Sequence, residues 1–149
     1  MTNNDVLRSV RYMLNVSDAK LIEIARLADC EITQEDIVAF LKRDDEEGYR
    51  ECDHEVMAHF LDGLIFYKRG RNRDLPRHPI EIPITNNIVL KKLRVAFELK
   101  DTDIIALIEK SGLTVSKTEL GAFFRKQGHR NYRECGDQFL RNLLKGLTP

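Results

Sequence analysis

The tetrapeptide Tyr-Arg-Glu-Cys occurs twice in the chain and places a thiol close to a cation. The two copies are Tyr49-Arg50-Glu51-Cys52 and Tyr132-Arg133-Glu134-Cys135. A reactive cysteine needs a nearby base or cation that favours the thiolate, and Arg50 or Arg133 could supply that charge. The same residues suit a structural junction, in which Tyr packs on a core and Cys is a small buried apolar residue. We favour the structural interpretation for both copies.

Two other groups of side chains have the types that bind metal ions. Cys52, His54 and His59 follow a C-x-H-x4-H spacing, but a structural zinc site needs four ligands and no familiar set has this spacing. The acidic run Asp44–Glu47 lacks the alternating oxygen ligands of an EF-hand loop. We therefore expect no metal and no other cofactor.

A third pattern is typical of nucleic-acid binding. The stretch 101–126 reads as helix, turn and helix, which resembles the arrangement of a DNA reader. Its five-residue turn, 111–115, is longer than the usual three or four residues, and the sequence pI of about 6.9 is low for such a domain. Phosphate contacts would make binding salt-dependent. The candidate cations, which would equally suit an acidic protein partner, are Arg69, Arg71, Arg73, Arg77, Lys117, Arg125 and Lys126.

Signatures of familiar enzymes are missing from the chain. It has no nucleophile elbow, no phosphate-binding glycine loop and no HExxH motif. The leading hypothesis is therefore a non-enzymatic helical protein-interaction or scaffold module. Nucleic-acid binding through the cations named above is the alternative.

A tandem duplication supplies the elements that position these residues. Shifting the sequence by 83 positions aligns residues 2–66 with 85–149 without a gap. Thr2-Asn3-Asn4 then matches Thr85-Asn86-Asn87, Ala39-Phe40 matches Ala122-Phe123, and the two Tyr-Arg-Glu-Cys blocks coincide. The sequence therefore predicts a first repeat (residues 1–67), a linker (68–84) and a second repeat (85–149).

Apolar residues at helical spacing predict four helices in each repeat, and hence an all-α fold. In the first repeat we expect Asn3-Asn4 to cap the first helix, the second helix to begin after Ser17, and a Thr33/Asp36 capping box to open the third. The fourth helix should span about 53–67. Prolines keep the linker from being helical, and residues 80–84 should be extended. The repeats can pack about a pseudo-twofold axis or form two separate lobes.

Charge divides the two repeats. The first carries 7 Lys and Arg against 15 Asp and Glu, the linker 5 against 2, and the second repeat 12 against 7. Opposite charges can hold the repeats together or join one chain to another, and salt screens such attraction beyond about 8 Å. We therefore expect salt-sensitive self-association, as a weak dimer.

Composition indicates an ordinary globular protein without a membrane span. Of the 149 residues, 42% are hydrophobic, and no apolar run approaches the roughly 18 residues of a transmembrane helix. The first ten residues lack a signal-peptide layout. Three cysteines without a CxxC pair suggest free thiols, so we expect a cytoplasmic protein with no membrane partner.

The opening TNN-x-VL, the duplicated YREC block and the FLDGLI ending of the first repeat resemble the YehS-like family of uncharacterised bacterial proteins. The resemblance covers the whole chain. It implies a small helical cytoplasmic protein with two copies of one unit. It implies no activity, cofactor or functional residue, because none is established for the family.

Overall fold

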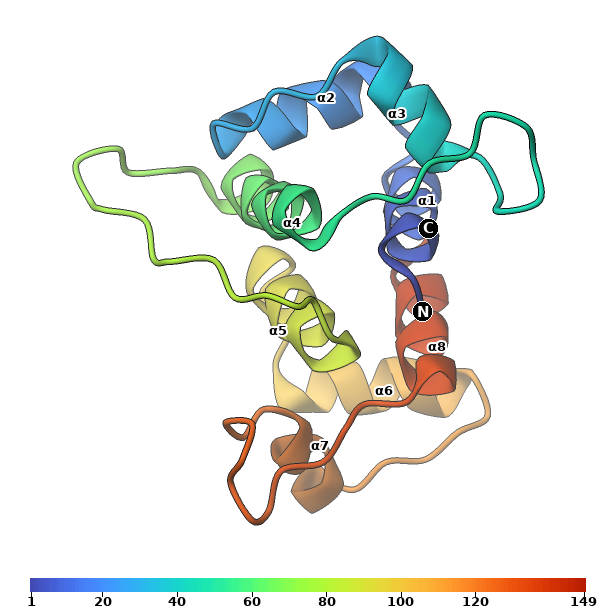
Figure 1. Ribbon diagram of the computed structural model, residues 1–149. Helices are drawn as coiled ribbons and strands as arrows, with labels where there is room; N and C mark the ends of the chain where they lie inside the picture. The colour runs from blue at the N-terminus through green and yellow to red at the C-terminus, as the bar shows by residue number, and fades with distance from the viewer.

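The computed structural model describes all 149 residues and contains eight helices and no strand, so the predicted all-α class is confirmed (Figure 1). The first repeat contains α1 (Asn3–Leu14), α2 (Asp18–Leu27), α3 (Gln34–Leu41) and α4 (His54–Arg69). The second contains α5 (Asn86–Ala96), α6 (Asp101–Lys110), α7 (Lys117–Phe123) and α8 (Asp137–Leu147).

The duplication is visible in these bounds. Helices α2 and α6 coincide after the 83-residue shift, and the other three pairs begin at equivalent residues. Helix α4 has 16 residues and α8 has 11. Helix α4 continues two residues beyond the predicted Tyr67 to Arg69, and the C-cap residue Gly70 follows with a φ of 83°, which suits glycine. The two repeats therefore share one plan and differ most in their last helix.

The prediction that Asn3-Asn4 caps the first helix is wrong. Thr2 is the N-cap: its hydroxyl accepts the Asp5 backbone N–H at 3.0 Å, and the Asp5 carboxylate accepts the Thr2 N–H at 3.0 Å. Because this capping box already satisfies the helix start, both asparagines lie inside the first turn. Their side chains are free to bond elsewhere.

The second asparagine is a buried connector between distant parts of its repeat. Asn4 Nδ2 donates to the Phe40 carbonyl at 3.0 Å and to the Arg50 carbonyl at 2.9 Å, while its Oδ1 accepts the Cys52 N–H at 3.0 Å. In the second repeat Asn87 makes the same three bonds, at 3.0, 2.7 and 2.9 Å. This connector ties the first helix to the end of the third and to the segment that enters the fourth.

One hydrophobic core joins the two repeats. Its cluster of 27 buried residues draws on both, so the chain is not two separate lobes. Helix α4 packs on α5, and α8 packs on α1 (Figure 1). Helices α4 and α8 are equivalent, and so are α5 and α1. The two contacts are therefore related by the exchange of the repeats, as a pseudo-twofold axis requires. The Ile84 N–H, which donates to His54 Nδ1 at 2.9 Å, and the Met1 ammonium, which bonds Asp137, are also equivalent.

Gly63 and Gly146 are equivalent glycines with different surroundings, and they allow a matched test of packing. A Cβ on Gly63 would lie 2.1 Å from the Ile24 carbonyl oxygen, whereas a Cβ on Gly146 would lie 3.4 Å from the nearest Leu107 atoms. We expect Gly63→Ala to lower the free energy of unfolding by about 2 kcal/mol or more, because the backbone of α2 must move. Gly146→Ala should be neutral or slightly stabilising. Equal urea midpoints for the two variants would contradict this account.

Replacing the buried connector should also be costly. Asn4 is only 2% exposed, and Asn4→Ala leaves the Phe40 and Arg50 carbonyls and the Cys52 N–H without their side-chain partner. We expect a loss of about 3 kcal/mol in the free energy of unfolding, measured by chemical denaturation. The control is Asn3→Ala, whose side chain donates to the Cys52 carbonyl at 3.0 Å from a less buried position. If Asn3→Ala were the more damaging of the two, the connector role would be wrong.

Candidate functional site

The linker folds back onto the first repeat through two arginines. Arg71 donates to the Leu27 carbonyl and Arg77 to the Ala28 carbonyl, each at 2.8 Å. These carbonyls lie at the end of α2, where the helix dipole favours a cation. Both guanidinium groups also lie over the Phe66 ring, at 5.0 and 5.9 Å from its centre. The two side chains therefore hold the linker against α2 and α4.

Two aspartates complete this attachment. Asp29 accepts Arg71 at 2.9 Å and Arg73 at 3.3 Å, and these hydrogen bonds lower the pKa of its carboxyl. Asp62 accepts Lys92 at 2.7 Å and Arg77 at 2.8 Å. Burial raises the pKa of Asp62, but the hydrogen bonds from Lys92 and Arg77 outweigh it, so that the pKa lies below its usual value. Asp62 thereby joins the linker to α5 as well as to α4.

The fourth linker arginine reaches the second repeat. Arg69 lies 3.3 Å from the Glu98 carboxylate and donates to the Val95 carbonyl at 3.2 Å. All four linker arginines that the sequence suggested for phosphate contact therefore pair with carboxylates of the same chain. Their observed contacts hold the linker in place.

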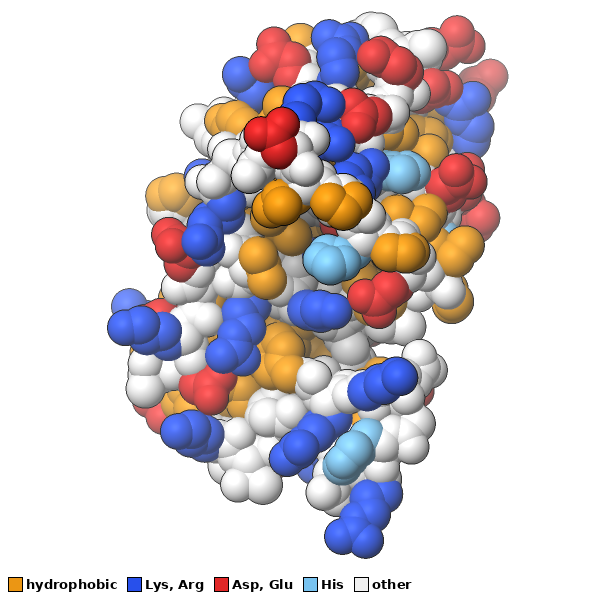
Figure 2. Space-filling view, turned by 90° about the vertical axis from the view of Figure 1, so that its left-hand side faces the viewer, with side chains coloured by type: hydrophobic (Ala, Val, Ile, Leu, Met, Phe, Trp, Pro, Cys, Tyr) orange, Lys and Arg blue, Asp and Glu red, His pale blue; other side chains and the backbone are white.

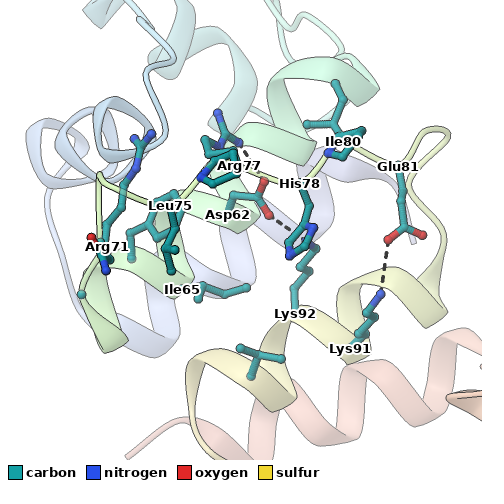
Figure 3. Close-up of a pocket in the computed structure, with 16 residues that line it drawn as sticks. Asp62, Ile65, Arg71, Leu75, Arg77, His78, Ile80, Glu81, Lys91 and Lys92 are labelled. Carbon is teal, nitrogen blue, oxygen red and sulfur yellow. Dashed lines mark hydrogen bonds and ion pairs between the residues drawn. The ribbon is translucent and has the colours of Figure 1, made fainter.

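The attached linker forms one wall of an open pocket of about 830 Å³, with α4 and α5 opposite (Figure 3). Ile65 and Phe66 of α4, Leu75 of the linker and Val95 of α5 supply its apolar lining. The side chains of Leu75 and Val95 are 64% and 42% exposed, which is high for large apolar residues. This volume lies within the usual range of about 300–1,000 Å³ for ligand sites.

Charged side chains form the rim of this linker pocket. Figure 3 shows Lys91 reaching Glu81, at 3.3 Å, on one side and His78 of the linker above Lys92. Lys91 and Glu81 are both more than half exposed, whereas Lys92 is held against Asp62. The pocket thus combines an apolar lining with a cationic rim, of which Lys91 is the most accessible part.

The Tyr-Arg-Glu-Cys junctions are built on the asparagine connectors. Cys52 and Cys135 are each 4% exposed, and burial raises the pKa of both thiols to about 12. Arg50 pairs with Asp36 and lies 5.3 Å from the centre of the Phe40 ring, so its charge is directed away from the thiol. At neutral pH both cysteines therefore remain protonated.

The three remaining candidate cations are placed differently. Lys117 begins α7, while Arg125 and Lys126 follow it, and all three are exposed and outside any ion pair of the chain. In Figure 2, Lys and Arg side chains predominate over the lower part of the face, where the second repeat lies. The seven predicted cations thus form two groups: four bound into the linker and three free on the second repeat.

The histidines near Cys52 have structural partners. His54 accepts the Ile84 N–H, and His59 Nδ1 lies 3.2 Å from Arg77. Nowhere do three Cys, His, Asp or Glu side chains gather as a metal site would need. No helix has both the length and the apolar character needed to cross a membrane.

The buried thiols give a testable reactivity order. Cys30 is half-buried with a raised pKa, due chiefly to burial, whereas Cys52 and Cys135 have pKa values of about 12. Because only the thiolate reacts, we expect an aromatic disulfide reagent at pH 8 to modify Cys30 first and the other two only after unfolding. Cys30→Ser should abolish the fast phase. Rapid modification of Cys52 in the folded protein would overturn the structural role of the junction.

Comparison with known proteins agrees with the duplicated architecture. Residues 3–70 and 86–149 each match the family described as "Protein of unknown function (DUF1456)". The chain is 48% identical over 148 residues to "Uncharacterized protein YehS" of Escherichia coli (strain K12), covering 99% of this chain and 95% of that protein. No solved structure matches it. The chain therefore belongs to the DUF1456 family, whose conserved unit it contains twice.

Proposed function

We propose that this protein is a non-enzymatic interaction module that docks a segment of a partner protein in the linker pocket. The observation that supports this function is the pocket itself, about 830 Å³ in volume and lined by apolar side chains. Leu75 and Val95 leave large parts of their side chains exposed there. An apolar side chain of a partner would cover both residues, as anchors do at the centre of protein interfaces.

The charged residues of the linker pocket indicate which kind of partner segment it would bind. Four cationic side chains line the pocket, Arg71, Arg77, Lys91 and Lys92, against the two carboxylates Asp62 and Glu81. The pair between Lys91 and Glu81 is exposed, and exposed pairs contribute only about 0–1 kcal/mol. A partner carboxylate can therefore replace Glu81 at little cost. The favoured occupant is a segment that carries an apolar side chain next to acidic residues.

The attached linker makes the site ready to bind. Arg71 and Arg77, which fix the linker wall, each have less than a quarter of the side chain exposed. Pro76 and Pro79 stiffen the same wall. A wall that is ordered in the free protein loses little conformational entropy on binding, which favours affinity.

The test combines a displayed peptide library with a pair of variants. We expect the wild-type protein to enrich peptides that contain Leu or Phe beside Asp or Glu. Val95→Glu places a carboxylate in the pocket wall and should weaken an enriched peptide by tenfold or more, which corresponds to about 1.4 kcal/mol. Tyr12→Glu is the matched control, because Tyr12 is the exposed equivalent of Val95 on α1 and lies outside the pocket.

Three outcomes would overturn the proposal. One is enrichment of basic rather than acidic peptides, and another is equal weakening by Val95→Glu and Tyr12→Glu. The third is self-association: if light scattering finds a salt-sensitive dimer that Val95→Glu abolishes, the pocket binds a second copy of the chain. A monomer at both low and high salt excludes that occupant.

A further inference from the structure

The loop between α7 and α8 carries three arginines that form no ion pair within the chain. Arg125, Arg130 and Arg133 are exposed and line one pocket of about 450 Å³ together with Tyr132. None of them belongs to an ion pair of the chain, although the pocket also contains Glu119. This arginine pocket lies on the second repeat and is separate from the linker pocket.

The first repeat builds the same backbone with a different pattern of charges. Arg50 is the equivalent of Arg133, and it pairs with Asp36. Lys42 is the equivalent of Arg125, and it donates to the Glu47 carbonyl at 2.8 Å. Glu47 itself stands where the second repeat has Arg130. Because the first repeat folds with one of these arginines paired and another replaced by Glu47, the fold does not require three unpaired arginines at this place.

The surroundings extend the positive charge. Lys117, at the start of α7, and Lys126, just after Arg125, are exposed and have no ion-pair partner. Figure 2 shows few acidic side chains among the Lys and Arg side chains over this part of the molecule. A ligand that approaches the arginine pocket therefore meets a positive field before it makes contact.

We propose that the arginine pocket binds the phosphates of a single-stranded nucleic acid, with Tyr132 stacking on a base. Guanidinium groups match phosphate oxygens in paired hydrogen bonds, and an aromatic ring among cations is the usual platform for unpaired bases. A duplex fits less well, because the arginines lie in a loop and a pocket and not along a recognition helix. Helix α7 has only seven residues, and 111–116 separate it from α6.

Binding is tested by fluorescence anisotropy with a labelled oligothymidylate over a range of salt concentrations. Single strands release about 0.7 counterion for each phosphate contact, so three contacts predict a log–log slope of about −2. The double variant Arg125→Ala/Arg130→Ala should make this slope shallower by about 1.4 and weaken binding at low salt. Both side chains are exposed, so the variant should fold.

Two further variants separate the contributions. Arg26→Ala/Arg43→Ala removes the same charge from two exposed positions of the first repeat and should leave the slope unchanged. Tyr132→Leu should weaken binding about tenfold at an unchanged slope, because stacking does not depend on salt in the way that phosphate contacts do. Val95→Glu, at the linker pocket, should have no effect on the slope, so this inference and the proposed protein docking fail independently.

Several results would overturn the inference. One is a wild-type protein that does not bind the oligothymidylate at low salt. Another is an equal loss of slope in Arg125→Ala/Arg130→Ala and in Arg26→Ala/Arg43→Ala, which would indicate nonspecific attraction. Tighter binding of a duplex of the same length would assign the surface to double-stranded nucleic acid and contradict a pocket for single strands.

Discussion

A buried side-chain amide holds each repeat together. Asn4 and Asn87 each satisfy two carbonyls and one N–H that would otherwise lie unpaired beside the core. The segment they fix has no helical hydrogen bonds of its own, and an unpaired buried polar group is costly. The first helix, the end of the third and the start of the fourth therefore keep one arrangement. The repeated Tyr-Arg-Glu-Cys block is the segment whose backbone bonds the asparagines, and its cysteines are buried in the core.

The linker breaks the symmetry that the repeats establish. Three of its four arginines attach to Asp29 and Asp62, which lie in the first repeat, and the equivalent positions of the second repeat hold Gly112 and Lys145. The linker can therefore fold over one side of the molecule only. A pocket forms where it crosses α4 and α5, while the α7–α8 loop on the other repeat keeps its cations free. The two repeats thus share a backbone plan but differ in the surfaces that they expose to solvent.

Much of the fold could be predicted from the sequence, because helical periodicity and the 83-residue shift are local or regular signals. Thr33 and Ser17 mark helix starts by the same local chemistry. The role of Asn4 could not be read in this way, since its three partners lie 36 to 48 residues away. The intrachain partners of the linker arginines could not be predicted for a similar reason. Four cations in a short segment suggest a surface for phosphate, and nothing near them in sequence shows that Asp29, Asp62 and Glu98 pair with them. The linker pocket forms only when the linker packs on α4 and α5, so no sequence motif predicts it.

The position of the chain ends has a consequence for the topology. The Met1 ammonium contacts Asp137 at the start of α8, just as the Ile84 N–H contacts His54 at the start of α4. The two ends of the chain lie near the contact between α8 and α1 (Figure 1). The repeats therefore meet at two equivalent contacts, α4 with α5 and α8 with α1, and the backbone connects the helices of the first contact only. The packing does not dictate which of the two contacts the backbone crosses, so a circular permutant that joins the present ends and opens within the linker should keep the helix packing, while it loses the linker pocket and the positive charge of the Met1 ammonium beside Asp137.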